Sequence, residues 1–311
     1  MTSAVLWDDR RVNFDTHTVD LSAGRVAEYE THGSGEPLLY FAGGPGENAA
    51  LLRDDAQRLA ERFAVHLIEP HGSGGSSAPS DPSQYDPVGH ASFYEEVRQA
   101  LGLERVNIMG FSFGGAVALA YAGLFPDVTA RCISVAGRAL GAAAGADSDE
   151  EMERALTRHR HASWYPSARR TWDEWPERVS ALTDSRELDE MMLTVMPLYM
   201  AHPEQPSVQV RIESWRRDLR SNLSAALAWE GGLWETLDLR AELANIVAPT
   251  LLLAGEQDLI CGPVAARQIA DVVNHAETVT IPDCGHFIPT EAPAAFDDAV
   301  FRFCERHPFA G

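Results

Sequence analysis

Apolar and polar residues follow two different patterns along this chain. In its first part, short runs that are apolar almost throughout alternate with segments of helical spacing. The runs are Pro37–Ala42, Ala64–Glu69, Val106–Phe111 and Val128–Ala136. Strands of this kind, separated by helices, predict a parallel sheet that is covered on both faces.

The segments around these runs complete the first domain. Arg11–Leu21 and Arg25–Thr31 alternate apolar and polar residues, which predicts a hairpin of half-buried strands. Helical spacing is found in Ala49–Phe63, Phe93–Leu101 and Gly114–Leu124. The pattern therefore predicts an α/β fold whose mostly parallel sheet is flanked by helices.

The pattern of apolar and polar residues changes between Leu140 and Leu243. This stretch is mostly helical in spacing, is interrupted by prolines, and holds six of the seven tryptophans. The strand and helix alternation then returns in Pro249–Gly255, Pro263–Val273, Glu277–Ile281 and Glu291–Arg306. We therefore expect one sheet domain, built from residues 1–139 and 244–311, with a helical cap inserted at residues 140–243.

Charge and cysteine content restrict the possible functions. The chain has 25 basic and 46 acidic residues, a formal net charge of −21. Nucleic acids and anionic membranes bind basic surfaces, so neither is expected as a partner. Every basic residue is an arginine, which excludes a lysine Schiff base and a P-loop lysine. Four widely spaced cysteines and an N-terminus without an apolar signal segment predict a cytoplasmic protein.

The most informative motif is Gly110-Phe111-Ser112-Phe113-Gly114, which fits the pattern G-x-S-x-G. An apolar strand precedes it and a helix of small residues follows at once. In this setting a serine is held on a sharp turn with its hydroxyl exposed, and the glycines leave room for the neighbouring backbone. An ordinary tight turn is the competing interpretation; the setting favours a nucleophile at Ser112.

A nucleophilic serine needs a base, and the base needs an acid that orients it. Asp258 follows the strand Pro249–Gly255, and His286 follows the next strand. Parallel strands bring both loops to the sheet edge where the serine turn lies. Glu256 and Asp283 are rival candidates for the acid. For the oxyanion, backbone N–H donors are expected from Phe113 and from the glycine loop at residues 42–46.

These residues resemble the α/β-hydrolase superfamily. The loop Gly43-Gly44-Pro45-Gly46 is similar to the H-G-G-P-G loop of prolyl aminopeptidases, also called proline iminopeptidases, and residues 69–76 are loosely similar to another of their segments. The resemblance implies that Ser112, Asp258 and His286 form a catalytic triad and that Gly44 and Phe113 form the oxyanion hole.

Several positions depart from that family's pattern. The loop histidine is replaced by Ala42, an aspartate by Glu69 and an arginine by His71. The elbow also reads Gly-Phe-Ser-Phe-Gly where those peptidases usually have Gly-Gly-Ser-Trp-Gly. None of these changes affects the three proposed catalytic residues, so the departures put the proline preference in doubt and leave hydrolysis intact. Those peptidases recognise the free amine of the substrate with cap carboxylates. The candidates here are Glu213 and Glu230, each close to a tryptophan, Trp215 and Trp229. Solvated glutamates and core tryptophans are the alternative interpretation.

The sequence thus predicts a serine hydrolase that forms an acyl-enzyme, with a prolyl-aminopeptidase-like activity on small peptides or amides. An esterase, a lactonase or a hydrolase of carbon–carbon bonds is the alternative, and a non-catalytic ligand-binding protein is a minor one. A dinucleotide-binding oxidoreductase is disfavoured because Gly72–Ser76 lacks the required third glycine. No cofactor and no metal site are expected, and the oligomeric state is left open.

Overall fold

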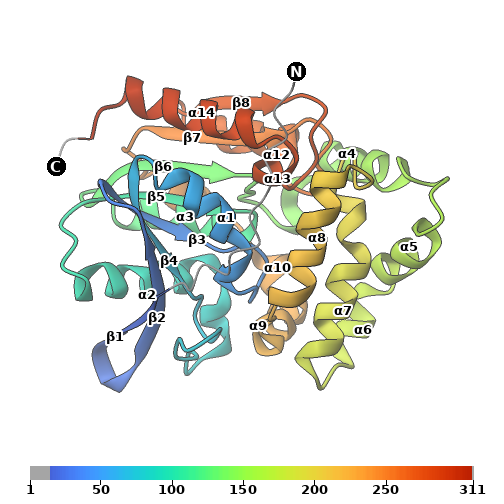
Figure 1. The fold of residues 1–311 in the computed structure, drawn as a ribbon, viewed down its shortest axis with the longest axis horizontal. Coiled ribbons are helices and arrows are strands. Elements are labelled where there is room, and N and C mark those ends of the chain that lie inside the picture. Colours follow the sequence, from blue (N-terminus) through green and yellow to red (C-terminus); the bar gives the residue numbers. More distant parts are fainter. Residues whose placement is uncertain (1–14, 310–311) are drawn as a thin grey trace.

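The computed structural model describes residues 15–309, in which eight strands form a single sheet (Figure 1). The strands are β1 Thr16–Asp20, β2 Val26–His32, β3 Glu36–Phe41, β4 Phe63–Ile68, β5 Val106–Phe111, β6 Thr129–Val135, β7 Thr250–Gly255 and β8 Glu277–Ile281. Their order is β1-β2-β4-β3-β5-β6-β7-β8, antiparallel from β1 to β4 and parallel from there on. The predicted fold class is confirmed.

Helices cover both faces of the sheet because its central strands are apolar on both sides. One core cluster joins the sheet to α2 Pro87–Ala100, α3 Phe113–Leu124, α11 Arg240–Leu243 and α12 Pro263–Ala270. A second cluster joins the opposite face to α1 Arg53–Leu59, α13 Ile288–Glu291 and α14 Pro293–Arg306. Leu39 and Phe41 of β3 point into the first cluster, whereas Leu38 and Tyr40 point into the second. This alternation follows from the two-residue period of a strand.

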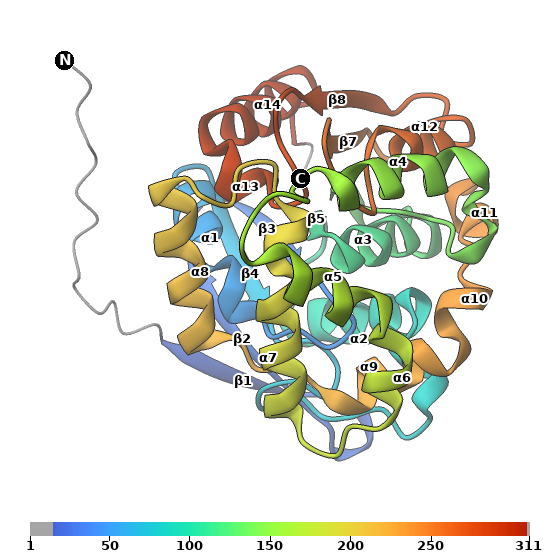
Figure 2. The same ribbon diagram turned by 90° about the vertical axis from the view of Figure 1, so that its right-hand side faces the viewer.

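The chain between β6 and β7 is mostly helical. Its α-helices are α4 Ala146–Thr157, α5 Tyr165–Asp173, α6 Trp175–Ser180, α7 Ser185–Val195, α8 Pro206–Asp218, α9 Leu223–Ala228, α10 Trp234–Thr236 and α11, the last of which packs in the core of the sheet domain. Most of them gather beside the sheet on the right of Figure 1, and Figure 2 shows them in front of it. We call this segment the cap.

Two predicted helices differ from the structure in their bounds. Helix α2 begins at Pro87, six residues before the expected start at Phe93. The Asp86 carboxylate caps it by accepting a hydrogen bond of 2.6 Å from the Gly89 N–H, and a proline in the first turn favours the same start. The predicted helix Ala49–Phe63 is a 3₁₀ turn at Ala49–Leu52 followed by α1. The prediction followed apolar spacing and missed these capping signals.

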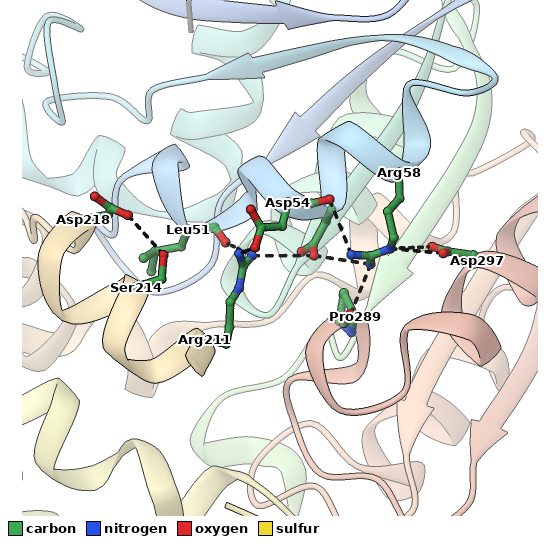
Figure 3. Close-up of polar contacts among 9 residues, drawn as sticks. Leu51, Asp54, Arg58, Arg211, Ser214, Asp218, Pro289 and Asp297 are labelled. Carbon is green, nitrogen blue, oxygen red and sulfur yellow. Dashed lines mark hydrogen bonds and ion pairs between the residues drawn. The ribbon is translucent and has the colours of Figure 1, made fainter. Parts of the chain in front are cut away.

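Arg211 of α8 attaches the cap to the sheet domain (Figure 3). Its guanidinium donates a hydrogen bond of 2.9 Å to the Leu51 carbonyl and pairs with the carboxylates of Asp54 and, at 3.7 Å, Asp55. It also lies over the Trp215 ring, 5.4 Å from the centroid. Burial raises the pKa of Asp55 to about 7 and lowers that of Arg211 to about 10. The contact is therefore a largely buried ion pair.

We expect Arg211→Ala to lower the free energy of unfolding by about 3 kcal/mol, because removing one partner of a buried pair leaves the other charge uncompensated. Arg216→Ala is the matched control on the same helix. Arg216 is exposed and pairs with an exposed glutamate, so its loss is expected to cost less than ~0.5 kcal/mol. Urea unfolding of both variants measures the difference. Equal stabilities would contradict the prediction.

Candidate active site

Ser112 lies on a strained turn between β5 and α3. Its backbone has φ 55° and ψ −118°, a conformation that non-glycine residues rarely adopt. A Cβ atom on Gly110 would lie 1.8 Å from the Gly114 carbonyl oxygen, and one on Gly114 would lie 2.4 Å from the Ala42 oxygen. The two glycines of the motif are therefore required by close backbone contacts.

Ser112, His286 and Asp258 form one chain of hydrogen bonds. The Nε2 atom of His286 lies 2.8 Å from the Ser112 hydroxyl, and its Nδ1 atom lies 2.8 Å from Asp258 Oδ2. Both His286 and Asp258 are buried. The second oxygen of Asp258 accepts the N–H groups of Ile260 and Cys261, at 2.9 and 3.1 Å. An ionised Asp258 places the imidazole proton on Nδ1, which leaves Nε2 free to accept the proton of Ser112.

The rival acids lie elsewhere. Asp283 is exposed and accepts hydrogen bonds of 2.9 Å from His202 and Gln257. Glu256 accepts the backbone N–H of Asp283 at 3.0 Å. Neither carboxylate is a hydrogen-bond partner of His286, so the geometry favours Asp258 as the orienting acid.

The carboxylate of Glu291 supports the loop that carries His286. It accepts hydrogen bonds from the backbone N–H groups of Gly285 and Phe287, both at 3.1 Å, and from that of Ala201 in the cap, at 2.7 Å. Burial raises its pKa above the ordinary value. The residues on both sides of His286 are thus fixed by a single side chain, which marks Glu291 as a positioning residue.

We expect Glu291→Ala to lower kcat by about 10- to 100-fold, because a small displacement of His286 disturbs the alignment with Ser112. Glu291→Gln retains one acceptor oxygen and should recover part of the loss. Steady-state kinetics on p-nitrophenyl acetate, with thermal unfolding of each variant, measure the effect. A glutamine variant as poor as the alanine variant, or an alanine variant with full activity, would argue against this role.

The two predicted donors of the oxyanion hole lie on neighbouring loops. Phe41 of β3 pairs in register with Gly110 of β5. Gly44 follows the end of β3 and has φ +55°, and Phe113 is the first residue of α3. The two loops therefore leave adjacent parallel strands at matching positions, as two donors aimed at one oxygen require.

The four predicted substrate-binding residues of the cap do not lie together in the structure. The Trp229 ring meets the Phe113 ring edge-on, 5.3 Å away, and Glu230 accepts a hydrogen bond of 3.0 Å from the Trp175 indole N–H. Trp215 is buried 4.7 Å from the ring of Phe287, the neighbour of His286.

Glu213, by contrast, is not brought together with the other site residues. Its side chain is 61% exposed on α8 and pairs with Arg216. The expectation that it contacts substrate is therefore not supported. On a helix, a residue two positions away lies on a different face, so sequence proximity to the buried Trp215 was a misleading signal.

Besides Glu291, two residues at the site escaped the sequence prediction. The Tyr199 ring lies 5.4 Å from the His286 ring, and its carbonyl accepts the His286 N–H at 2.7 Å. No sequence signal links this cap residue to the catalytic loops. Glu47 directly follows the glycine loop, and a charged residue at that point was an available signal. Burial raises its pKa to about 7.

The fold defines an α/β protein with a mostly parallel sheet, and the comparisons with known proteins specify its family. The alpha/beta hydrolase fold model matches residues 36–293, and the chain belongs to that family. A proline iminopeptidase from Levilactobacillus brevis is 25% identical, with 87% of this chain and 89% of that one covered. The resemblance found in the sequence is thereby confirmed.

Other similarities are to an acyltransferase and, in fold alone, to solved hydrolase structures. A 1-acylglycerol-3-phosphate O-acyltransferase from Arabidopsis thaliana is 26% identical over 88% of this chain and 67% of its own. Among solved structures, an alpha/beta fold family hydrolase from Bacillus anthracis matches with a TM-score of 0.71 at 16% identity, covering 93% of this chain and 99% of that one. An enol-lactonase from Burkholderia xenovorans matches with a TM-score of 0.69 at 19% identity, covering 93% and 100%.

Among residues 15–309, no group of three or more histidine, cysteine, aspartate or glutamate side chains could hold a metal ion. Within the same residues, no helix is both long enough and apolar enough to cross a membrane.

Proposed function

We propose that this chain is a serine hydrolase that acts through an acyl-enzyme. The observation that carries the proposal is the hydrogen-bonded chain from Ser112 through His286 to Asp258 at a strained turn. His286 takes the proton of Ser112 as the seryl oxygen attacks the substrate carbonyl. The N–H groups of Gly44 and Phe113 stabilise the oxyanion.

The second half of the cycle uses the same residues. His286 donates its proton to the leaving group, the bond to that group breaks, and the seryl ester remains. Water then attacks the ester while His286 accepts a proton from it, and Ser112 is regenerated with release of the acid. Asp258 stabilises the imidazolium in both halves.

For the substrate we propose a small peptide or amide with a free amino terminus. The support is the glycine loop at residues 43–46 and the proline iminopeptidase relative at 25% identity. An esterase or lactonase is the second candidate, because the aromatic residues around the site also suit an uncharged acyl group. We propose a cytoplasmic location, since the four cysteines are buried free thiols.

Three substrates test the proposal: L-proline p-nitroanilide, its N-acetyl derivative and p-nitrophenyl acetate, with the Ser112→Ala protein as the blank. We expect cleavage of the free-amine anilide and of the ester, and little cleavage of the acetylated anilide. Ester cleavage alone would retain the hydrolase and reject the peptidase. Equal rates in wild type and blank on all three substrates would reject the mechanism.

A further inference from the structure

Arg138 is a buried arginine at the junction of the cap and the sheet domain. It follows the end of β6 and is 7% exposed. Each of its three nitrogens donates a hydrogen bond: Nε to the Leu140 carbonyl at 2.7 Å, Nη1 to the Ile260 carbonyl at 2.8 Å and Nη2 to the Ser148 hydroxyl at 3.0 Å. The acceptors belong to three different parts of the chain, and this one side chain holds them together.

The contact with Ile260 leads to Asp258. The Ile260 carbonyl and the Cys261 N–H belong to one peptide unit, whose atoms lie in a plane with the C=O and N–H pointing in opposite directions. Arg138 holds the oxygen of this unit, and the N–H donates to Asp258 Oδ1 at 3.1 Å. The other carboxylate oxygen, Oδ2, lies 2.8 Å from His286 Nδ1. The guanidinium, the peptide unit, the carboxylate and the imidazole therefore form one continuous chain of hydrogen bonds.

The positive charge at the start of this chain strengthens its next step. A guanidinium bonded to the carbonyl polarises the peptide and makes its N–H a better donor, because hydrogen bonds in series reinforce one another inside a protein. Among residues 15–309, no carboxylate forms an ion pair with Arg138. Burial raises the pKa of the Cys261 thiol, Asp258 raises it further, and Arg138 opposes the rise. The guanidinium and the Asp258 carboxylate thus act on the same buried group.

Two further contacts of Arg138 lie in the cap. Ser148 belongs to α4 and is itself buried, and the guanidinium lies over the ring of Trp234 in α10, 4.9 Å from the centroid. A planar guanidinium whose three nitrogens all donate cannot turn without losing a hydrogen bond. The docked cap therefore fixes the direction in which Arg138 points, and with it the peptide that contacts Asp258.

We propose that Arg138 is a positioning residue for the catalytic acid, an inference that rests on the proposed hydrolase function. It acts through the Ile260–Cys261 peptide: the guanidinium fixes the peptide, the peptide N–H fixes Asp258 Oδ1, and the carboxylate orients the imidazole of His286. Without Arg138 the buried carbonyl loses a charged donor, and the peptide is free to rotate away from Asp258. A role in cap docking alone would leave the hydrogen bond between Asp258 and His286 unchanged when Arg138 is replaced.

Two variants of Arg138 test this role. Arg138→Met keeps an apolar stem and removes the charge and every donor, whereas Arg138→Lys keeps the charge and a donor for the Ile260 carbonyl. We expect Arg138→Met to lower kcat on p-nitrophenyl acetate about 10- to 100-fold with KM within a few-fold of wild type, because a small displacement in the catalytic chain is costly. Arg138→Lys should recover part of the loss. Thermal unfolding of each variant checks the fold.

A second readout needs no turnover. The His286 Nδ1–H is buried and hydrogen-bonded to Asp258, so its proton resonance in the NMR spectrum lies at low field. Its absence in His286→Gln assigns it. We expect this resonance to move upfield or disappear in Arg138→Met and to be displaced less in Arg138→Lys, because the hydrogen bond lengthens when the carboxylate is no longer held.

Arg98→Met is the matched control for the loss of a buried arginine. Arg98 is 9% exposed on α2, pairs with Glu95 at 2.7 Å, and forms its hydrogen bonds within residues 95–104. Its replacement should lower the free energy of unfolding and leave the resonance and kcat unchanged. Ser148→Ala removes one cap acceptor of Arg138 but not the bond to Ile260, so it should leave the resonance in place.

A wild-type resonance in a folded Arg138→Met protein would overturn the proposal. An equal displacement in Arg98→Met or in Ser148→Ala would also overturn it, because the effect would then come from lost stability or from cap docking. If Arg138→Met does not fold, Arg138→Lys decides, and wild-type resonance and kcat in that variant would overturn the proposal. If the resonance moves as expected but no substrate is cleaved, the hydrolase proposal fails and the positioning of Asp258 stands.

Discussion

Ser112→Ala is expected to lower kcat/KM on any cleaved substrate by about 10⁵-fold, because the alanine methyl group cannot form the acyl-enzyme. The rate that remains would come from substrate binding and from the N–H donors of the oxyanion hole, which act without the nucleophile. The fold should be unaffected. The change removes one oxygen atom, and the close contacts of the turn belong to Gly110 and Gly114.

The measurement is kcat/KM for wild type and variant on p-nitrophenyl acetate and L-proline p-nitroanilide, with thermal unfolding as the check on folding. Ser92→Ala is the matched control. That serine is exposed on α2, its hydroxyl only donates to the Val88 carbonyl, and its removal should leave the activity unchanged. If Ser112→Ala retains more than about 1% of the activity in a folded protein, covalent catalysis by Ser112 is rejected.

Most of the sheet could be predicted from the sequence because its strands are buried on both faces. A run such as Val106–Phe111 is apolar at almost every position, and its strand in the structure is buried throughout. The residues near Ser112 and His286 were equally accessible to prediction, because the connections of parallel strands bring the ends of β5, β7 and β8 to one edge.

The cap was predictable as a helical segment but not in its details. Which helix faces the site depends on packing between segments far apart in the sequence, such as the attachment of Arg211 to Asp54 and Asp55. Tyr199 reaches His286 through a tertiary contact of this kind. Spacing within the chain carries no information about such contacts.

Asp258→Asn is expected to lower kcat by about 10⁴-fold while leaving the geometry nearly unchanged. The carboxylate now accepts the Nδ1–H of His286, which fixes Nε2 as the acceptor for the Ser112 proton. An asparagine that turns its NH₂ group toward His286 stabilises the other tautomer, in which Nε2 carries the proton and cannot accept one. It also removes the negative charge that stabilises the imidazolium.

The two rival carboxylates provide the controls for this variant, since Asp283→Asn and Glu256→Gln make the same chemical change in the neighbouring loops. Asp283 is exposed and the Glu256 carboxylate accepts the backbone N–H of Asp283, so each variant should retain kcat within a few-fold of wild type. Kinetics of the three variants on one substrate identify the acid directly. A large loss in Asp283→Asn with a small loss in Asp258→Asn would transfer the orienting role to Asp283. That outcome would require His286 to turn away from Asp258 during turnover, because Asp283 now pairs with His202 on the protein surface.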